Sequence, residues 1–312
     1  MNNPVSRLAP SPTGALHLGN ARTFVINWAM ARKRDWKLLL RIEDLDGPRV
    51  KPHAIEETLD ILSWLGMDHD GEPIRQSTDL EPYRKAMEEL TEKQLAYTCS
   101  LSRKEIKQAS TAPHKGEHDL RYPSHLRPDH AEAFQFGAQD TNYRLIVSDE
   151  VVYIHDGFAI SREFHPFSEV GDFVIWTRRN LPAYQLAVVV DDARQGVTDV
   201  VRGDDLQPSA ARQELLYQAL GLSSPHWWHL PLVLGPDGRR LAKRHGDTRI
   251  SSYRDQGVSV ERIIGLLAFW SGIGEIHKEM SITDFLSTFS LSSLDPNPIT
   301  FTEEDHAWLI GR

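Results

Sequence analysis

The sequence of 312 residues contains a single cysteine, Cys99. One cysteine excludes a disulfide framework and a metal site built only from cysteines of the same chain. Long apolar runs are also missing, because the longest, over residues 263–270, is far shorter than the roughly 20 residues that span a bilayer. Residues 1–4 have neither the basic nor the apolar region of a secretory signal. We therefore expect a cytoplasmic protein with no membrane segment.

An excess of positive charge is absent as well. The chain has 35 Lys and Arg against 44 Asp and Glu, which gives a net charge of −9. Proteins that bind nucleic acid indiscriminately usually carry a basic domain. Any contact with RNA must therefore depend on local basic patches, for which residues 32–34 and 239–240 are candidates. The hydrophobic content of 40% is that of an ordinary folded protein.

The order of periodic segments predicts an α/β fold. An apolar strand at 5–9, a helical pattern from Leu18 into the basic residues 32–34, and a strand at 38–42 form a βαβ unit with parallel strands. Helices are predicted at 54–65, 81–94 and 209–220, the last with Ser209 as N-cap. Strands are predicted at 143–147, 151–155, 173–177, 186–190, 196–202 and 229–234, and the chain becomes mostly helical from Val258. We expect four parts: 1–97, a polar insert at 98–142, 143–250 and 251–312.

A His and a Gly stand at the predicted start of the first helix, just after the first strand. Backbone N–H groups and the helix dipole at such a site attract phosphate, and a glycine lets a nucleotide approach the backbone. His17 can donate a hydrogen bond to a phosphate oxygen. Taken alone, an ordinary strand–turn–helix corner explains these residues equally well. The segment is neither a P-loop nor a Gly-x-Gly-x-x-Gly fingerprint.

Residues 7–20 resemble the "HIGH" signature of class I aminoacyl-tRNA synthetases, in the form typical of glutamyl-tRNA synthetases, and the resemblance continues through 21–23 and 40–46. Asn20 departs from the class-wide signature, which has His there. The resemblance implies a Rossmann-like catalytic core with a parallel sheet, a small inserted subdomain and a helical C-terminal subdomain. The signature residues are Pro10, Ser11, Pro12, Thr13, Gly14, Ala15, Leu16, His17, Leu18, Gly19 and Asn20.

A second signature follows a predicted strand and a Gly-Pro-Asp-Gly turn, and it looks like the "KMSKS" loop of the same class. Its residues are Arg240, Leu241, Ala242, Lys243 and Arg244. A basic loop suits a negative charge that grows on a departing pyrophosphate, although a solvated basic loop is the alternative for this segment alone. The resemblance implies that His17 and Lys243 are catalytic. It implies an ATP site formed by His17, Gly19, Asn20 and Lys243.

Four residues far apart in the sequence are candidates for an amino-acid pocket: Arg7, Glu43, Tyr184 and Arg202. They stand at the ends of predicted strands, where ligands gather in open α/β sheets. Guanidinium groups suit the carboxylates of glutamate, an anion suits its ammonium group, and a buried arginine rejects glutamine. Structural ion pairs, for instance of Arg41 or Arg202 with Glu43 or Asp204, are the alternative. The resemblance implies glutamate contacts at Arg7, Ala9, Ser11, Glu43, Tyr184 and Arg202.

A zinc site found in many relatives is degenerate in this sequence. The relatives carry Cys-x-Cys and then Tyr-x3-Cys, whereas the aligned residues here are Cys99, Leu101, Tyr122 and Leu126. Only Cys99 and Tyr122 keep possible ligands, and a structural zinc site needs four. The nearby His114, His118 and His125 are interpreted as part of a solvated polar loop. We therefore expect no zinc.

The resemblance implies that ATP and Mg²⁺ activate L-glutamate as glutamyl-adenylate, and that the glutamyl group then passes to tRNA. Full-length relatives add a large anticodon-reading region after the second signature, and this chain ends at Arg312. That length implies a short member of the family, which modifies the queuosine base of tRNA(Asp), and we expect a monomer. The alternatives are a catalytic core that charges tRNA(Glu) and a non-catalytic module that binds adenylate.

Overall fold

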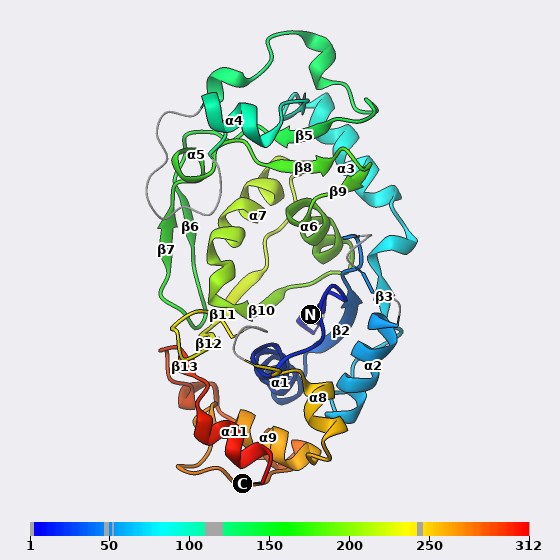
Figure 1. Cartoon of the computed structure of the whole chain (residues 1–312). Helices are drawn as coiled ribbons and strands as arrows, with labels where there is room; N and C mark the ends of the chain where they lie inside the picture. The colour runs from blue at the N-terminus through cyan, green and yellow to red at the C-terminus, as the bar shows by residue number, and fades with distance from the viewer. Residues whose placement is uncertain (1–2, 47–49, 52, 110–120, 242–245, 312) are drawn as a thin grey trace.

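Parallel strands form the centre of the molecule (Figure 1). The computed structural model describes residues 3–46, 50–51, 53–109, 121–241 and 246–311. Strands β1 (Val5–Leu8), β2 (Lys37–Ile42) and β3 (Ile74–Arg75) pair in parallel in the order β1-β2-β3, and β10 (Asp199–Gly203) pairs in parallel with β11 (His226–Leu230). The segment leading into β10 lies beside β1, because the Thr198 N–H donates to the Val5 carbonyl at 2.9 Å. The predicted parallel α/β core is confirmed.

Helix α1 (Leu18–Lys33) crosses between β1 and β2, as the spacing predicts. Its buried residues are mostly apolar, with Arg22 and Asn27 among them, and its last turn holds Arg32 and Lys33, which suit the negative end of the helix dipole. Strand β2 is buried from Leu38 to Ile42, which explains why apolar residues occupy both of its faces, with Arg41 as the one charged residue in this stretch. Together these elements place residues 9–17 and Glu43 at the carboxyl ends of β1 and β2.

An antiparallel sheet lies at one end of the molecule in Figure 1 and includes most of the strands of the middle region. Its order is β4 (Ala96–Cys99), β5 (Asn142–Leu145), β8 (Val174–Thr177) and β9 (Leu181–Pro182). The hairpin of β6 (Val152–Ile154) and β7 (Arg162–Phe164) stands beside it. The sheet therefore joins segments from both sides of the expected boundaries of the insert 98–142.

One predicted strand is wrong. Residues 186–190 belong to helix α6 (Tyr184–Arg194), whose residues from Gln185 to Asp192 are all buried. A helix that is covered on every side shows no amphipathic period, and its run of valines is typical of strands. Contacts with the surrounding core override that local preference.

Two other boundaries differ from the prediction. Helix α7 (Gln207–Ala219) has Leu206 as its N-cap, so Ser209 lies inside the helix, where its hydroxyl oxygen accepts from Gln185 Nε2 at 3.1 Å. The segment predicted as one strand at 229–234 is divided between β11 and β12 (Val233–Leu234). Pro231 lies between these strands, and a proline cannot donate to a ladder.

The remaining helices cover the sheets and form the C-terminal part, which is helical as predicted. They are α2 (Ala54–Trp64), α3 (Glu81–Glu92), α4 (Arg103–Ala109), α5 (Pro166–Glu169), α8 (Ile250–Asp255), α9 (Val260–Phe269), α10 (Ile282–Thr288) and α11 (Glu303–Leu309). Strand β13 (Ile299–Thr300) pairs in parallel with β12. Short 3-10 turns lie at Gln76–Thr78, Ser124–Leu126, Ala131–Phe134, Asp204–Leu206 and Leu291–Ser293. Within the described ranges, no helix combines the length and apolar character needed to cross a membrane.

Candidate active site

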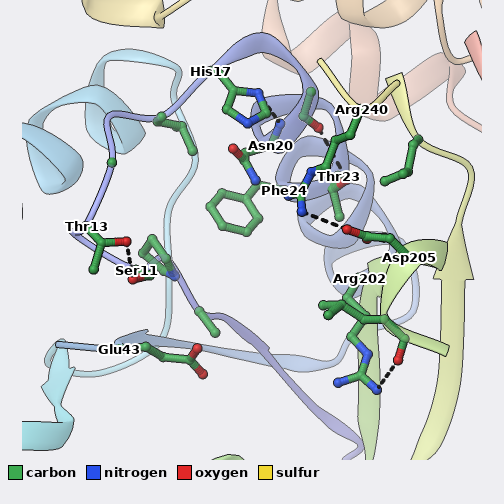
Figure 2. Close-up of a pocket in the computed structure, with 18 of the residues that line it drawn as sticks. Ser11, Thr13, His17, Asn20, Thr23, Phe24, Glu43, Arg202, Asp205 and Arg240 are labelled. Carbon is green, nitrogen blue, oxygen red and sulfur yellow. Dashed lines mark hydrogen bonds and ion pairs between the residues drawn. The ribbon is translucent and has the colours of Figure 1, made fainter. Parts of the chain in front are cut away.

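A cavity of about 450 Å³ opens at the carboxyl ends of β1, β2 and β10 (Figure 2). All six residues predicted to contact glutamate line it: Arg7, Ala9, Ser11, Glu43, Tyr184 and Arg202. The described residues of the predicted ATP site line it too, namely His17, Gly19 and Asn20, together with Arg240 of the second signature. Ala242, Lys243 and Arg244 lie outside the described residues. The structure thus brings the predicted residues together, while their individual roles stay predictions.

The imidazole of His17 is neutral, and a hydrogen bond at Nδ1 holds the ring in one orientation. It caps α1, because Nδ1 accepts from the Asn20 N–H at 3.4 Å. Burial, and then the positive charge of Arg240, lower the pKa of His17 to about 4. With Nδ1 accepting, the proton is on Nε2, which can donate to a phosphate oxygen. A Cβ on Gly19 would lie 3.2 Å from His17 Cε1, so glycine leaves the space that this ring needs.

The described residues on both sides of 242–245 lie next to the first signature. Leu18 N–H donates to the Thr248 carbonyl at 3.1 Å, and Ile250 N–H donates to the Leu16 carbonyl at 2.9 Å. On the other side of residues 242–245, Leu241 is buried. Arg240 forms an ion pair of 2.7 Å with Asp205, and both side chains line the cavity. The flanks of the basic loop are therefore held at the same cavity as His17.

A buried ion-pair cluster supports the opposite end of the cavity. Arg7 Nε lies 3.2 Å from Asp192 Oδ1, and Arg41 Nη1 lies 2.6 Å from the same oxygen. Arg41 Nη2 also reaches Glu43 Oε1 at 3.2 Å, so one of the ion pairs considered as the structural alternative is present. Burial raises the pKa of Glu43, against the opposing charges of Arg41 and Arg7.

The acidic side of this cluster is not among the residues predicted from the sequence. Asp191 and Asp192 are fully buried on α6. Asp191 accepts from Gln76 Nε2 at 2.7 Å and from Arg194 Nε at 2.7 Å. The signal was available, because two adjacent aspartates directly after the apolar run 186–190 would require partners if they are buried with it. The incorrect strand over 186–190 obscured it.

Arg202 is held from three elements. It is 5% exposed, and it donates from Nε to His229 Nε2 at 3.0 Å, from Nη1 to Gln213 Oε1 at 2.9 Å and from Nη2 to the Leu206 carbonyl at 3.2 Å. Its guanidinium carbon lies 4.7 Å from the ring centroid of Trp227. Figure 2 shows Arg202 and Glu43 on opposite sides of the cavity, with His17 and Arg240 toward the far end. The site therefore separates a part suited to carboxylates from a part suited to phosphates.

The residues aligned with the zinc site of relatives do not fit a metal. Cys99 Sγ lies 3.5 Å from the Tyr122 hydroxyl, which donates to the Leu126 carbonyl at 3.1 Å. Both side chains are buried in a small apolar cluster, with Leu101 and Leu126 packed against it. Across the described ranges, which do not include His114 and His118, no group of three or more His, Cys, Asp or Glu could hold a metal ion. The absence of zinc itself stays a prediction.

The parallel sheet and the two adjoining signatures define the catalytic core of a class I aminoacyl-tRNA synthetase. Residues 5–299 match the family described as tRNA synthetases class I (E and Q), catalytic domain. The chain resembles the glutamate-tRNA synthetase structure from Elizabethkingia anophelis with a TM-score of 0.80 and 26% identity, over 99% of this chain and 70% of that one.

Two curated relatives are similar over most of their length, and both are named glutamyl-Q tRNA(Asp) synthetase. The protein of Rhodopirellula baltica is 46% identical over 88% of this chain and 86% of its own length. The protein of Symbiobacterium thermophilum is 39% identical over 98% of both chains. The chain belongs to the class I glutamyl- and glutaminyl-tRNA synthetase family and, within it, to the glutamyl-Q tRNA(Asp) synthetases.

Proposed function

We propose that this chain activates L-glutamate with ATP and transfers the glutamyl group to the queuosine base of tRNA(Asp). One observation carries the activation step: a single cavity joins two buried arginines and Glu43 to the N-terminus of α1 and the second signature. The acceptor is supported by the two relatives that match this chain over most of their length.

The first step needs no covalent enzyme nucleophile. An oxygen of the glutamate α-carboxylate attacks the α-phosphorus of ATP, the bond to the β-phosphate oxygen breaks, and pyrophosphate leaves. ATP enters as its magnesium complex. His17 Nε2–H binds a phosphate oxygen, the positive end of the α1 dipole favours the phosphate charge, and Lys243 balances the charge that develops on pyrophosphate. The protein contributes positioning and fixed charge, which can supply most of such a rate enhancement.

Glutamate itself is held by groups of opposite charge. Arg7 and Arg202 bind its carboxylates, Glu43 binds its ammonium group, and Tyr184 offers a hydroxyl at the mouth of the cavity, where it is 43% exposed. Glutamine would present an amide N–H₂ to a guanidinium group, and two donors cannot pair. The pocket therefore selects glutamate before ATP reacts.

In the second step, a hydroxyl of the acceptor attacks the acyl carbon and AMP leaves. The protein works as a cytoplasmic monomer that binds tRNA through local basic patches. A core that charges tRNA(Glu) is the alternative function, since the similar glutamate-tRNA synthetase structure is matched over 70% of its chain. A non-catalytic module is disfavoured by the complete set of Arg7, Glu43 and Arg202 around the cavity.

The test is transfer of labelled glutamate to three acceptors: tRNA(Asp) with queuosine, tRNA(Asp) without it, and tRNA(Glu). We expect label on the first alone, and label on tRNA(Glu) alone would refute the proposed acceptor. Lys243→Ala should slow ATP–pyrophosphate exchange by orders of magnitude, on the scale of a lost transition-state charge contact. Near-normal exchange by that variant would show that Lys243 has no role in catalysis.

A further inference from the structure

A buried histidine behind Arg202 is used by neither signature. His229 on β11 is fully buried and stacks on Trp227, with ring centroids 6.1 Å apart. Its Nε2 lies 3.0 Å from Arg202 Nε. A guanidinium group can only donate, so Nε2 must accept and the imidazole proton must be on Nδ1. The direction of this hydrogen bond requires one tautomer of His229.

The other ring nitrogen meets a carboxylate that is itself fixed. His229 Nδ1 lies 2.5 Å from Asp156 Oδ2. Asp156 Oδ1 accepts backbone N–H groups from Phe158 at 3.0 Å, from Ala159 at 2.8 Å and from His229 at 3.1 Å. These three bonds set the rotation of the carboxylate, so Oδ2 faces the imidazole. A fixed acceptor at Nδ1 keeps the proton there.

Burial and the neighbouring guanidinium group favour the neutral imidazole. Burial, together with the positive charge of Arg202 on β10, lowers the pKa of His229, against the opposing effects of Asp156 and Asp205. Although burial opposes the charge of Asp156, its hydrogen bonds from His229 and Phe158 hold the pKa of this carboxyl below its usual range. An imidazolium at this position would place two donors, Nε2–H and Arg202 Nε–H, against each other.

The bonds of Arg202 leave room for a ligand. Within the described residues, its three hydrogen bonds use one N–H on each of Nε, Nη1 and Nη2. One N–H remains on Nη1 and one on Nη2, and each can donate to a carboxylate oxygen. The bonds to His229, Gln213 and Leu206 together set the direction in which these two N–H groups point.

We propose that Asp156 and His229 are positioning residues, which fix one imidazole tautomer so that Arg202 presents its free N–H groups to a carboxylate of glutamate. The proposal rests on the proposed function, because it takes glutamate as the ligand of Arg202. It predicts that reversing the tautomer weakens glutamate binding while ATP binding is unchanged.

Asp156→Asn is the sharpest test. The amide oxygen keeps the three backbone N–H bonds, so the NH₂ group faces His229 Nδ1 and the imidazole proton moves to Nε2. Two donors then meet at Arg202 Nε, and Arg202 rotates. We expect the KM for glutamate in ATP–pyrophosphate exchange, measured with tRNA(Asp) present, to rise about 10- to 100-fold, the scale of a hydrogen bond to a charged group. The KM for ATP should change less than about twofold, because His17 and α1 are untouched.

Companion variants separate positioning from folding. His229→Gln keeps an acceptor near the place of Nε2 and should retain most of the glutamate affinity, whereas His229→Leu should lose it. His226→Gln is the matched control, because His226 lies on the same strand with an exposed side chain, and its kinetics should be unchanged.

The outcomes distinguish the two proposals. Absence of glutamate-dependent exchange in the unaltered chain would refute the proposed function, whatever the variants do. Normal exchange in the unaltered chain with an unchanged glutamate KM in Asp156→Asn would overturn the positioning role. An equal rise of both KM values, or a lowered Tm with unchanged KM values, would also overturn it.

Discussion

The ion pair between Arg41 and Asp192 permits a quantitative test, because the surface carries a pair of the same length. Arg41 Nη1 and Asp192 Oδ1 are 2.6 Å apart with both side chains fully buried, and Arg254 Nη1 and Asp60 Oδ2 are also 2.6 Å apart, with side chains 30% and 60% exposed. Asp192→Asn leaves two buried guanidinium groups facing a neutral amide. Removing one partner of a buried pair costs about 3–5 kcal/mol, whereas an exposed pair contributes about 0–1 kcal/mol.

The loss for Asp192→Asn should lie near the lower limit, about 3 kcal/mol, because the amide oxygen still accepts one bond and Arg41 keeps Glu43 as a partner. For a chain of this size that corresponds to a fall in Tm of roughly 5 °C. Urea unfolding and thermal scans of Asp192→Asn and Asp60→Asn provide the measurement. Equal losses of unfolding free energy in the two variants would refute the conclusion that burial makes the Arg41–Asp192 pair contribute more to stability than the exposed pair.

The pH dependence gives an independent check on Asp192. Burial opposes its charge, but the charges of Arg41 and Arg7 hold the pKa of this carboxyl below its usual range. A carboxyl with a lowered pKa in the folded state contributes stability above its unfolded pKa, near 3.9, and loses it as the pH falls through the folded pKa. The stability difference between the unaltered chain and Asp192→Asn should therefore be constant above about pH 5 and shrink below about pH 4.

Two further predictions follow from buried groups elsewhere. Because burial lowers the pKa of His17 to about 4, protonation favours the unfolded chain, in which a histidine titrates near 6.5. His17 should therefore reduce the free energy of unfolding as the pH falls from about 6.5 toward 4, and a variant with Asn at this position should lack that part of the slope in a urea titration against pH. Because apolar packing encloses Cys99 and Tyr122, EDTA should leave the Tm unchanged, and a fall of several degrees that zinc reverses would contradict the expectation of no zinc site.

The sequence was most informative where local pattern and tertiary environment agree. The β1–α1–β2 unit was predicted because a strand buried on both faces and a helix with basic residues in its last turn have distinct patterns. Helix α6 was missed because its surroundings cover every face, so the helical period in hydrophobicity is lost. The six residues predicted to contact glutamate do line one cavity. They were predicted from the family resemblance and not from the hydrophobic periodicity of the chain.

The pairings of the supporting residues could not be predicted, because the partners are distant in the sequence. His229 and Asp156 are 73 positions apart, and Arg7 and Asp192 are 185 apart. Nothing in the sequence distinguishes the buried His229 from the exposed His226 on the same strand. Only the packing of β6, β10 and β11 shows which histidine has a carboxylate at one nitrogen and a guanidinium group at the other.

Helix α6 carries both a residue that lines the cavity and a residue that supports its arginines. Tyr184 is its first residue and lines the cavity. Asp192 lies eight positions later, about 12 Å along the axis, and forms ion pairs with Arg7 and Arg41. A helix transmits displacement along its length with little compression. A shift of α6 along its axis would therefore move Tyr184 and Asp192 by the same amount. If the proposed function is correct, the position of this helix is expected to influence glutamate affinity as much as the individual contacts do.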